Sequence, residues 1–552
     1  MRDRAKELTD NSPAQTWGLF RRLRLRASVN NRLALLSLGL TSLLLVSCAS
    51  SYQPDNGGDF DARFAEVMFS RGYKNVQSIY IEEVPPERLV MNGLKGLQDL
   101  DDKVVFRRDG AQIVLAYDGI PRARYPLPTA GNLDDWSDLT VALVESSRRE
   151  SSRINQASRE EIYESFFDNV TGQLDNFSHY ASLEEARQNR ASRDGFGGIG
   201  VRIRVEDEGV RVVSVMDDTP AQKSGLRNND LIVAVGGASA LLLKQREAVS
   251  YLRGPIGSQV MVTVRRQGQS LPLDISITRQ HVVPQTVKFQ RRGAVAYLRL
   301  SGFNADTTRA LKQAILQAQK QMGPELKGYI LDMRNNPGGI LAEAITVSDL
   351  FISKGRIVST GGRHQDSQQI FNAGDQDPLI DNKPLIALVN GNSASAAEIV
   401  ASALQDSNVA IVVGSNSYGK GTVQRVLDMP NAGELTLTWA RFYAPSGYAL
   451  HRRGVLPDIC TSTEGANSRN IVERLRHGQL SFSRQIQQLN INTKDEVALE
   501  AFRELCPQRQ SENDLDLEVA SRLIEDPVLY AQAKGLSRDT AAKPGDQLSQ
   551  LR

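Results

Sequence analysis

Short apolar segments alternate with longer helical segments through the middle of this 552-residue chain. In residues 306–322 apolar side chains recur at spacings of 4, 3 and 4, which indicates a helix with one buried face. Residues 395–404 are mostly small or apolar, contain no proline or glycine, and also favour a helix. Four runs have the composition of buried strands: residues 295–300, 329–333, 384–389 and 409–413. This alternation predicts an α/β core, and the length of the chain suggests three or four domains.

Ser395 and Lys420 lie 25 positions apart, on either side of the strand expected at 409–413. A serine hydroxyl is a poor nucleophile until a base takes its proton, and lysine is such a base only where burial makes its ammonium acidic. Ser395 would follow a buried strand and open a helix, whose first N–H groups are unpaired and suit an oxyanion. The alternative interpretation is that Ser393 or Ser395 simply caps the helix.

No histidine of the chain occurs in a recognisable serine-hydrolase pattern such as Gly-x-Ser-x-Gly. The sequence also contains no H-E-x-x-H and no paired cysteine spacing, so we expect no metal and no cofactor.

Further motifs accompany the serine and the lysine in a fixed order. They are residues 331–339 (LDMRNNPGG), 390–398 (NGNSASAAE), 419–424 (GKGTVQ), 445–447 (PSG) and 454–459 (GVLPDI). This set resembles the C-terminal processing peptidases, or tail-specific proteases, which are serine endopeptidases with a Ser-Lys dyad and a PDZ domain. The resemblance runs from about residue 80 to residue 459. It implies an α/β multidomain protein: a crotonase-like ββα-spiral protease core with an inserted PDZ domain and mixed or helical N- and C-terminal regions.

The resemblance also implies a role for each matching residue. Ser395 is expected to be the nucleophile, Lys420 the general base and Gln424 the residue that orients the lysine. The N–H of Ala396 and the N–H of one of two glycines would form the oxyanion hole, where each donor stabilises the transition state by about 3–4 kcal/mol. The sequence leaves the choice between Gly338 and Gly339 open. The chain departs from the family at Ala397, where serine is common, and we expect alanine to be tolerated.

A second domain is expected before the protease core. The glycine-rich segment 195–201 runs into an alternating strand, and a helix at 244–253 is followed by strands at 260–264 and 273–277. This order resembles a PDZ domain, which adds a peptide C-terminus as a strand to its sheet edge and holds the carboxylate on N–H groups of a loop. The resemblance implies that Gly197, Gly198 and Ile199 form that loop. Taken alone, the glycines would indicate only a flexible turn.

The N-terminus has the pattern of an export signal. The arginines at positions 21, 22, 24, 26 and 32 precede the apolar run 33–46, which is too short to span a bilayer comfortably but suits a signal-peptide core. The run ends at Ser47-Cys48, which resembles a lipoprotein signal with Cys48 as the lipidated residue; an ordinary signal peptide is the alternative. Because Ala49 and Ser50 are not acidic, we expect a lipid-anchored periplasmic protein at the outer membrane.

Two cysteines remain if Cys48 is lipidated. An oxidising periplasm permits Cys460 and Cys506 to pair in a disulfide, and two buried free thiols are the alternative. The net charge of +2 and the lack of a basic stripe outside the signal region argue against a nucleic-acid partner.

The sequence thus predicts a serine-type carboxyl-terminal processing endopeptidase that acts on exported polypeptides with accessible C-termini. An inactive PDZ-containing peptide-binding scaffold and acyl-CoA chemistry on the same core are the alternatives. An adaptor protein and a homo-oligomer are left open. The expected organisation is a lipoprotein signal peptide at 1–48, a tether at 49–58, a mixed α/β region at 59–190, the PDZ domain at 193–282, the serine protease core at 283–462, and a helical region with a disordered tail at 463–552.

Overall fold

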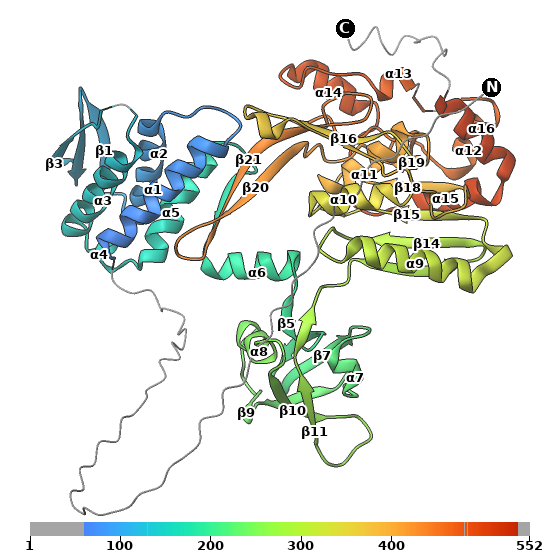
Figure 1. The fold of residues 1–552 in the computed structure, drawn as a ribbon, viewed down its shortest axis with the longest axis horizontal. Coiled ribbons are helices and arrows are strands. Elements are labelled where there is room, and N and C mark those ends of the chain that lie inside the picture. Colours follow the sequence, from blue (N-terminus) through green and yellow to red (C-terminus); the bar gives the residue numbers. More distant parts are fainter. Residues whose placement is uncertain (1–59, 130, 480, 483, 539–552) are drawn as a thin grey trace, which may run out of the picture. The chain divides into compact units, whose positions relative to one another are not determined.

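The computed structural model describes residues 60–538 except 130, 480 and 483 (Figure 1). The expected signal peptide, Cys48, the tether and the disordered tail lie outside the described residues. Among the helices described, none is long and apolar enough to cross a membrane. Over the same residues, no group of three or more His, Cys, Asp and Glu side chains is placed to hold a metal ion.

The N-terminal region is a bundle of helices beside a small antiparallel sheet of order β1-β2-β3 (Figure 1). Asp61 caps the first helix by accepting hydrogen bonds from the N–H groups of Arg63 and Phe64. Gly96 lets two helices meet closely, because a Cβ at Gly96 would lie 2.1 Å from the carbonyl oxygen of Ser165. The elements are α1 (Ala62–Ile79), α2 (Pro86–Leu100), β1 (Val104–Asp109), β2 (Gln112–Tyr117), β3 (Ile120–Pro126), α3 (Leu133–Glu150), α4 (Ser152–Gln156) and α5 (Arg159–Gly172).

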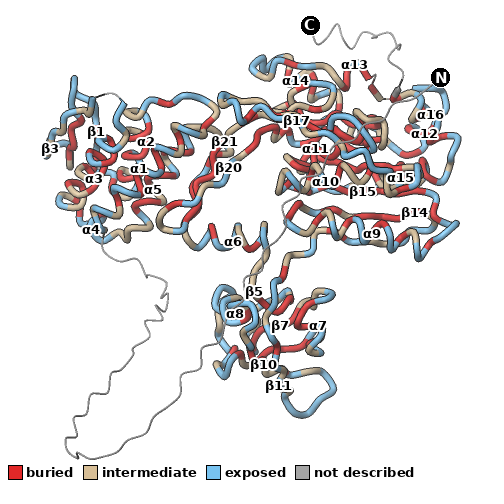
Figure 2. The backbone as a smooth tube through the Cα atoms, viewed as in Figure 1, coloured by how far each residue is buried: buried red, intermediate tan, exposed pale blue. Residues whose placement is uncertain are grey.

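The α/β core expected from the sequence is confirmed. Its six-stranded sheet has the order β13-β14-β15-β18-β19-β22, parallel from β14 onward, with β13 antiparallel at one edge. The central strands β15 and β18 are buried along their whole length (Figure 2), which explains their near-continuous apolar sequences. The strands are β13 (Val287–Arg292), β14 (Val295–Leu300), β15 (Gly328–Asp332), β18 (Leu385–Val389), β19 (Ile411–Gly414) and β22 (Ile459–Cys460).

Helices cover both faces of this sheet. Alternate strand residues, such as Leu331 and Ile330, point to opposite faces, and each face has its own apolar cluster. One cluster includes α9 (Thr307–Met322), α10 (Leu341–Asp349) and α11 (Ala396–Asp406). The other is closed by helices from the C-terminal region: α12 (Ser468–Arg476), α15 (Asp514–Glu525) and α16 (Pro527–Arg538). The protease core and the C-terminal region also contain shorter helical segments: η1 (Gly323–Glu325), η2 (Gln365–Ser367), α13 (Arg484–Gln487) and α14 (Glu496–Glu504).

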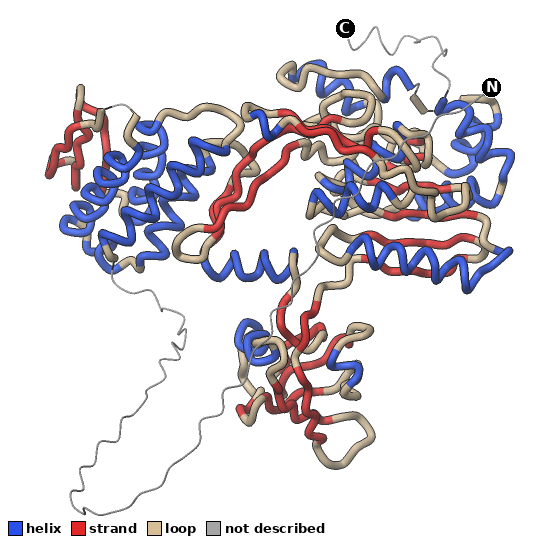
Figure 3. The backbone as a smooth tube through the Cα atoms, in the orientation of Figure 1, coloured by secondary structure: helices blue, strands red, loops and turns tan. Residues whose placement is uncertain are grey.

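A second sheet carries a long hairpin, visible as paired strands in Figure 3. Its order is β17-β16-β21-β20, and β4 from the N-terminal region pairs with β21. The apolar side chains of Met429, Leu435 and Leu437 on the hairpin join the core of the N-terminal helices. Buried Glu434 is held by two arginines of α6. The elements are β4 (His179–Ala181), α6 (Leu183–Arg193), β16 (Arg356–Gly361), β17 (Gln369–Asn372), β20 (Thr422–Asp428) and β21 (Glu434–Tyr443).

The segment between α6 and β13 forms a separate sheet with its own apolar cluster. The strand order β11-β10-β8-β7-β6 leaves β6 at an edge of the sheet. The elements are β5 (Phe196–Gly198), β6 (Val201–Glu206), β7 (Gly209–Val215), α7 (Pro220–Lys223), β8 (Leu231–Val235), β9 (Ala238–Ser239), α8 (Gln245–Leu252), β10 (Gln259–Arg265), β11 (Leu273–Thr278) and β12 (Gln280–Val282).

Candidate active site

Ser395 stands at the turn from β18 into α11, as the sequence predicted. Its backbone has φ +54° and ψ −114°, a conformation that non-glycine residues rarely adopt. The turn is held by a hydrogen bond from the N–H of Ala394 to the carbonyl oxygen of Asn336 (2.9 Å) and by one from the N–H of Ser395 to Glu398 Oε2 (2.8 Å). Such strain persists only where the surroundings fix it, and it is common at functional sites.

Two glycines follow β15, and the first of them, Gly338, lies against this turn. A Cβ on Gly338 would lie 2.8 Å from Cβ of Ser395, and a Cβ on Gly339 would lie 2.0 Å from the carbonyl oxygen of Phe303. Both glycines also have positive φ. Neither position therefore has room for a side chain, and this explains why glycine is required at both.

The hydrogen bonds of the turn distinguish the two glycines. The N–H of Gly338 donates to Asn336 Oδ1 (2.9 Å). Within the described part of the chain, the N–H groups of Gly339 and Ala396 donate to no acceptor. These two donors are therefore available to an incoming oxygen.

Ser395 opens onto the apolar cavity of about 580 Å³ that also contains both glycines. Gln424 from β20 lines the same cavity. Its apolar walls come from Phe303, Ile340, Leu341, Val423, Val426 and Phe442. The cavity thus places a serine hydroxyl and the free N–H of Gly339 beside a surface suited to apolar side chains.

Lys420 is half-buried, and its ammonium contacts an aromatic ring. Nζ lies 5.2 Å from the ring centroid of Phe177, in the loop before β4. No hydrogen bond joins Nζ to Ser395, to Gln424 or to another described residue. Burial lowers the pKa of Lys420, while Asp175 and Glu398 act in the opposite direction. The two side chains of the sequence-predicted dyad are therefore not hydrogen-bonded to each other in this structure.

The side-chain amide of Gln424 contacts both strands of the hairpin. Its Nε2 donates to Thr422 Oγ1 (2.7 Å) and to Thr438 Oγ1 on β21 (3.5 Å), and its carbonyl oxygen takes part in neither bond. A register shift between Val423 and Gln424 interrupts the pairing of β20 with β21 at this point.

Glu398 joins the serine and lysine loops, although we assigned it no role from the sequence. Its buried carboxylate accepts hydrogen bonds from the N–H groups of Ser395, Gly419 (2.7 Å) and Lys420 (2.9 Å) and from Ser417 Oγ. Burial raises the pKa of Glu398 to about 7, against these four bonds, which favour the carboxylate. Glu398 follows Ser395 by three positions, which is the capping-box pattern, so the sequence could have predicted its hydrogen bond with the N–H of Ser395.

Asp175 and Phe177 were also missed. Asp175 Oδ1 accepts the N–H groups of Phe177 (2.7 Å) and Ser178 (2.8 Å), which fixes the loop beneath Lys420. The ring of His451 meets that of Phe177 edge to face, and burial lowers the pKa of His451 to about 4, so this histidine is neutral. No local sequence signal connects residues so far apart in the chain.

The glycine-rich loop of the second domain differs in detail from expectation. Gly197 and Gly198 belong to β5 and pair with β12. Ile199 is buried in the apolar cluster of the domain. Among the described residues, the N–H groups of Ile199 and Gly200 find no acceptor. Ile199 belongs to the predicted loop, and Gly200 adds a second free donor directly after it.

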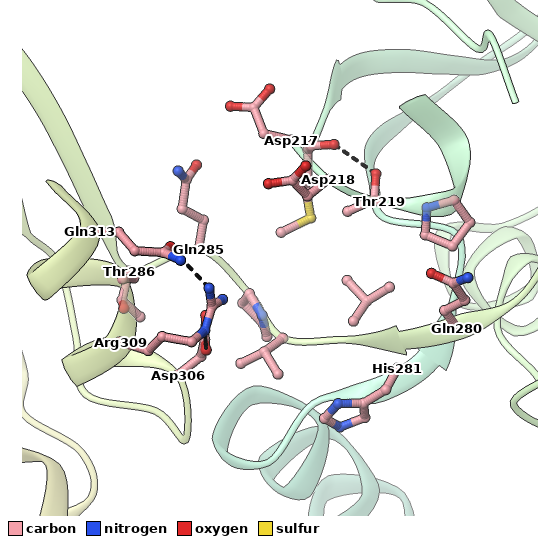
Figure 4. A pocket seen from close by; sticks show the side chains of 16 residues that line it. Asp217, Asp218, Thr219, Gln280, His281, Gln285, Thr286, Asp306, Arg309 and Gln313 are labelled. Carbon is pink, nitrogen blue, oxygen red and sulfur yellow. Dashed lines mark hydrogen bonds and ion pairs between the residues drawn. The ribbon is translucent and has the colours of Figure 1, made fainter. Parts of the chain in front are cut away.

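A smaller cavity of about 340 Å³ surrounds the linker that follows β12 (Figure 4). At its edge Arg309, near the start of α9, is held by Asp306 (2.5 and 2.6 Å) and by Gln313 (2.9 Å). None of the sequence-predicted site residues lines it, so the cavity at Ser395 is the better candidate.

Cys460 and Cys506 form a disulfide in the structure, with their Cα atoms 5.9 Å apart. Both cysteines are buried. The bond connects the last strand of the core sheet to the segment that follows α14. It therefore fixes part of the C-terminal region to the core.

Comparison with known proteins agrees with this architecture. Residues 294–461 match the model of Peptidase family S41, and residues 197–277 match the PDZ domain model.

Two curated relatives are similar to this chain. A Bartonella bacilliformis protein named "Carboxy-terminal-processing protease" is 44% identical over 288 residues, which cover 52% of this chain and 66% of the relative. A Staphylococcus epidermidis protein named "Probable CtpA-like serine protease" is 32% identical over 317 residues, covering 57% and 64%. The chain thus spans just under two thirds of the length of these relatives.

Among solved structures, the chain is similar to a photosystem II D1 C-terminal processing protease. The identity is 24%, and the alignment covers 71% of this chain and 92% of that one. The TM-score of 0.36 is too low to establish a shared fold by itself. The family and relative matches, taken with the motifs around Ser395 and Lys420, show that the chain contains a domain of peptidase family S41 preceded by a PDZ domain, and that it is similar to proteins named carboxy-terminal-processing proteases.

Proposed function

We propose that this protein is a serine endopeptidase that hydrolyses polypeptides whose free C-terminus is bound by the PDZ domain. One observation carries the proposal: Ser395, in a strained turn, shares an apolar cavity with Gly339, whose N–H is free, and lies next to the free N–H of Ala396. That combination supplies a nucleophile and an oxyanion hole.

The reaction follows from these groups. Ser395 Oγ attacks the scissile carbonyl carbon while the neutral amine of Lys420 accepts the hydroxyl proton. The oxyanion is held by the N–H groups of Ala396 and Gly339; we favour Gly339 because the N–H of Gly338 is already bonded to Asn336. When the C–N bond breaks, the Lys420 ammonium returns the proton to the leaving amine. Water then hydrolyses the acyl-enzyme by the same proton transfers.

Lys420 has to turn toward Ser395 for this chemistry. We propose that Phe177 holds the ammonium in the arrangement seen here and that Gln424 receives Nζ when it turns. The carbonyl oxygen of Gln424 suits that role, because only its Nε2 is bonded to Thr422.

We also propose how the substrate is held. The N–H groups of Ile199 and Gly200 would bind its terminal carboxylate. The edge strand β6 would pair with its last residues, and Val201, Ile203 and Leu252 would contact its apolar side chains.

The inactive-scaffold alternative is not supported, because the nucleophile, the lysine and the free donors are all retained.

We propose further that the strands and helices of the core form a crotonase-like ββα spiral and that the domain boundaries are those expected from the sequence. Export to the periplasm, lipidation of Cys48 and outer-membrane anchoring are part of the same proposal. So are an adaptor protein and a homo-oligomer as partners.

Two substitutions test the proposed activity. Ser395→Ala should reduce kcat on an unfolded protein with an apolar free C-terminus by on the order of 10⁴-fold or more. Lys420→Arg should be equally inactive although it keeps the charge, because a guanidinium does not deprotonate in this range. Circular dichroism should show that both variants remain folded. A folded Ser395→Ala variant with wild-type turnover would refute the proposal.

A further inference from the structure

A short segment of the C-terminal region contacts both catalytic loops. We name residues 506–510 the strap. On one side it holds the loop before Ser395: the N–H of Gly391 donates to the carbonyl oxygen of Arg509 (2.8 Å). The side-chain amides of Asn390 and Asn392 both donate to the carbonyl oxygen of Gln510 (3.1 Å each). The serine loop therefore rests on the backbone of the strap.

On the other side the strap holds the loop before Lys420. The N–H of Arg509 donates to Ser415 Oγ (3.1 Å). The side-chain amide of Gln508 donates to the carbonyl oxygens of Ser417 and Tyr418. These contacts occur immediately before Gly419 and Lys420, whose N–H groups bind Glu398.

The strap itself is fixed at its start and through one side chain. Cys506 begins it and is bonded to Cys460 at the end of β22. The guanidinium of Arg509 reaches buried Asp516 on α15 (2.5 Å) and the carbonyl oxygen of Thr461 (3.1 Å). The disulfide is thus the covalent connection between the core sheet and the segment that bridges the two loops.

We propose that the strap is a positioning element of the active site, that Gln508 is a positioning residue for the lysine loop, and that the Cys460–Cys506 disulfide makes the activity dependent on oxidation. This inference rests on the proposed peptidase function. Neither Cys506 nor Gln508 touches the cavity at Ser395, so both act through the loops.

The redox step is a simple exchange. A dithiol reductant such as dithiothreitol gives two electrons and two protons to the Cys460–Cys506 bond, which becomes two thiols, while the reductant closes to its own cyclic disulfide. The strap then keeps its hydrogen bonds and the ion pair of Arg509 with Asp516, but no cross-link to the core sheet. A small displacement of catalytic groups lowers kcat by roughly tenfold or more. Release of the strap should therefore lower kcat more than it changes KM.

The experiment uses the full chain and a fluorogenic peptide with a free apolar C-terminus. Wild type is assayed oxidised, after reduction verified by the appearance of two new thiols, and after reoxidation. We expect reduction to lower kcat roughly tenfold with little change in KM, and reoxidation to restore it. The double variant Cys460→Ser/Cys506→Ser should have the low kcat in both conditions and should not respond to the reductant.

Gln508→Ala tests the strap without altering the disulfide. It should lower kcat while leaving the thermal unfolding midpoint near that of wild type. Gln532→Ala is the matched control. The side-chain amide of Gln532 also donates to a backbone carbonyl, that of Arg476, but this bond involves neither catalytic loop. Its kcat should be unchanged.

The outcomes separate the two proposals. If oxidised wild type cleaves the peptide but fully reduced wild type keeps its kcat, the redox dependence is refuted. If Gln508→Ala matches Gln532→Ala in kcat, the positioning role of the strap is refuted. If oxidised wild type cleaves no such peptide, the proposed function fails and this inference fails with it.

Discussion

Opposing effects act on the pKa of Lys420. Burial disfavours the charged form and lowers the pKa, whereas the carboxylates of Asp175 and Glu398 favour it. The face of the Phe177 ring also favours the ammonium, since a cation is attracted to the negative face of an aromatic ring. The net shift is downward, so the neutral amine forms at a lower pH than in free lysine. Activity should therefore rise with pH through this ionisation.

Phe177→Leu should move the ascending limb of the pH–rate profile to lower pH. A cation–π contact is worth about 0.5–2 kcal/mol, and one pKa unit corresponds to about 1.4 kcal/mol, so the expected shift is roughly 0.4–1.5 units. Activity at neutral pH should increase, because the ammonium loses an interaction that holds it away from Ser395. The measurement is kcat as a function of pH.

Phe371→Leu is the control for that shift, because Phe371 is another half-buried phenylalanine that packs on the protease core. Its profile should coincide with that of wild type. Coincident profiles for Phe177→Leu and wild type would show that the ring contact has no part in holding the lysine.

At the scale of elements, β6 has the properties of a strand that receives a peptide. It pairs only with β7, and its inward-facing residues Val201, Ile203 and Val205 lie against the apolar cluster of the PDZ domain. The free N–H groups of Ile199 and Gly200 lie just before its first residue. An edge strand preceded by two unpaired donors suits an extended chain that ends in a carboxylate.

Amidation of the peptide C-terminus should weaken binding to the full-length Ser395→Ala variant. Hydrogen bonds to a charged group contribute about 1.5–3 kcal/mol, so the Kd should rise roughly 10- to 100-fold. The measurement is fluorescence titration of two peptides that differ only in a terminal carboxylate or carboxamide. Equal affinities would exclude a carboxylate site in this loop.

The elements with a local signal were the ones that the sequence could predict. Strands β14, β15, β18 and β19 and helices α9 and α11 follow from apolar runs and helical periodicity, and their positions locate Ser395. Two contacts could not be predicted: the pairing of β4 with β21 and the contact of Phe177 with Lys420. Each joins segments that are distant in the chain, and no sequence motif relates the two segments. The proposed preference for Gly339 over Gly338 in the oxyanion hole also required the structure, because it depends on which N–H group Asn336 binds.

At the scale of the whole molecule, the family match at 294–461 does not correspond to a complete core. One face of its sheet is covered by side chains of the C-terminal helices, among them Leu475, Leu523 and Tyr530. The hairpin that carries Gln424 is covered by the N-terminal helices. The core therefore depends on segments from both ends of the described chain.

We expect residues 294–461 expressed alone to lack a cooperative thermal transition, whereas residues 60–538 should unfold cooperatively. Exposing one large apolar side chain that is normally buried costs about 1.5–3 kcal/mol. The C-terminal helices bury so many such side chains against the sheet that losing these contacts would exceed a typical free energy of unfolding of about 5–15 kcal/mol. Circular dichroism during heating makes the comparison. A cooperative transition in the short fragment would show that the S41 domain is an independent folding unit.

The strap follows both catalytic loops in chain order, and this has a consequence during synthesis. A growing chain contains the serine, the lysine and the cavity-lining strands before residues 506–510 exist. Because proteins are made from the N-terminus, the segment that positions the two loops is made after both of them, and its disulfide can close only after that. On the strap proposal, a nascent molecule is therefore a poor protease toward its neighbours, and proteolytic competence appears only when the strap has been made and its disulfide has been oxidised.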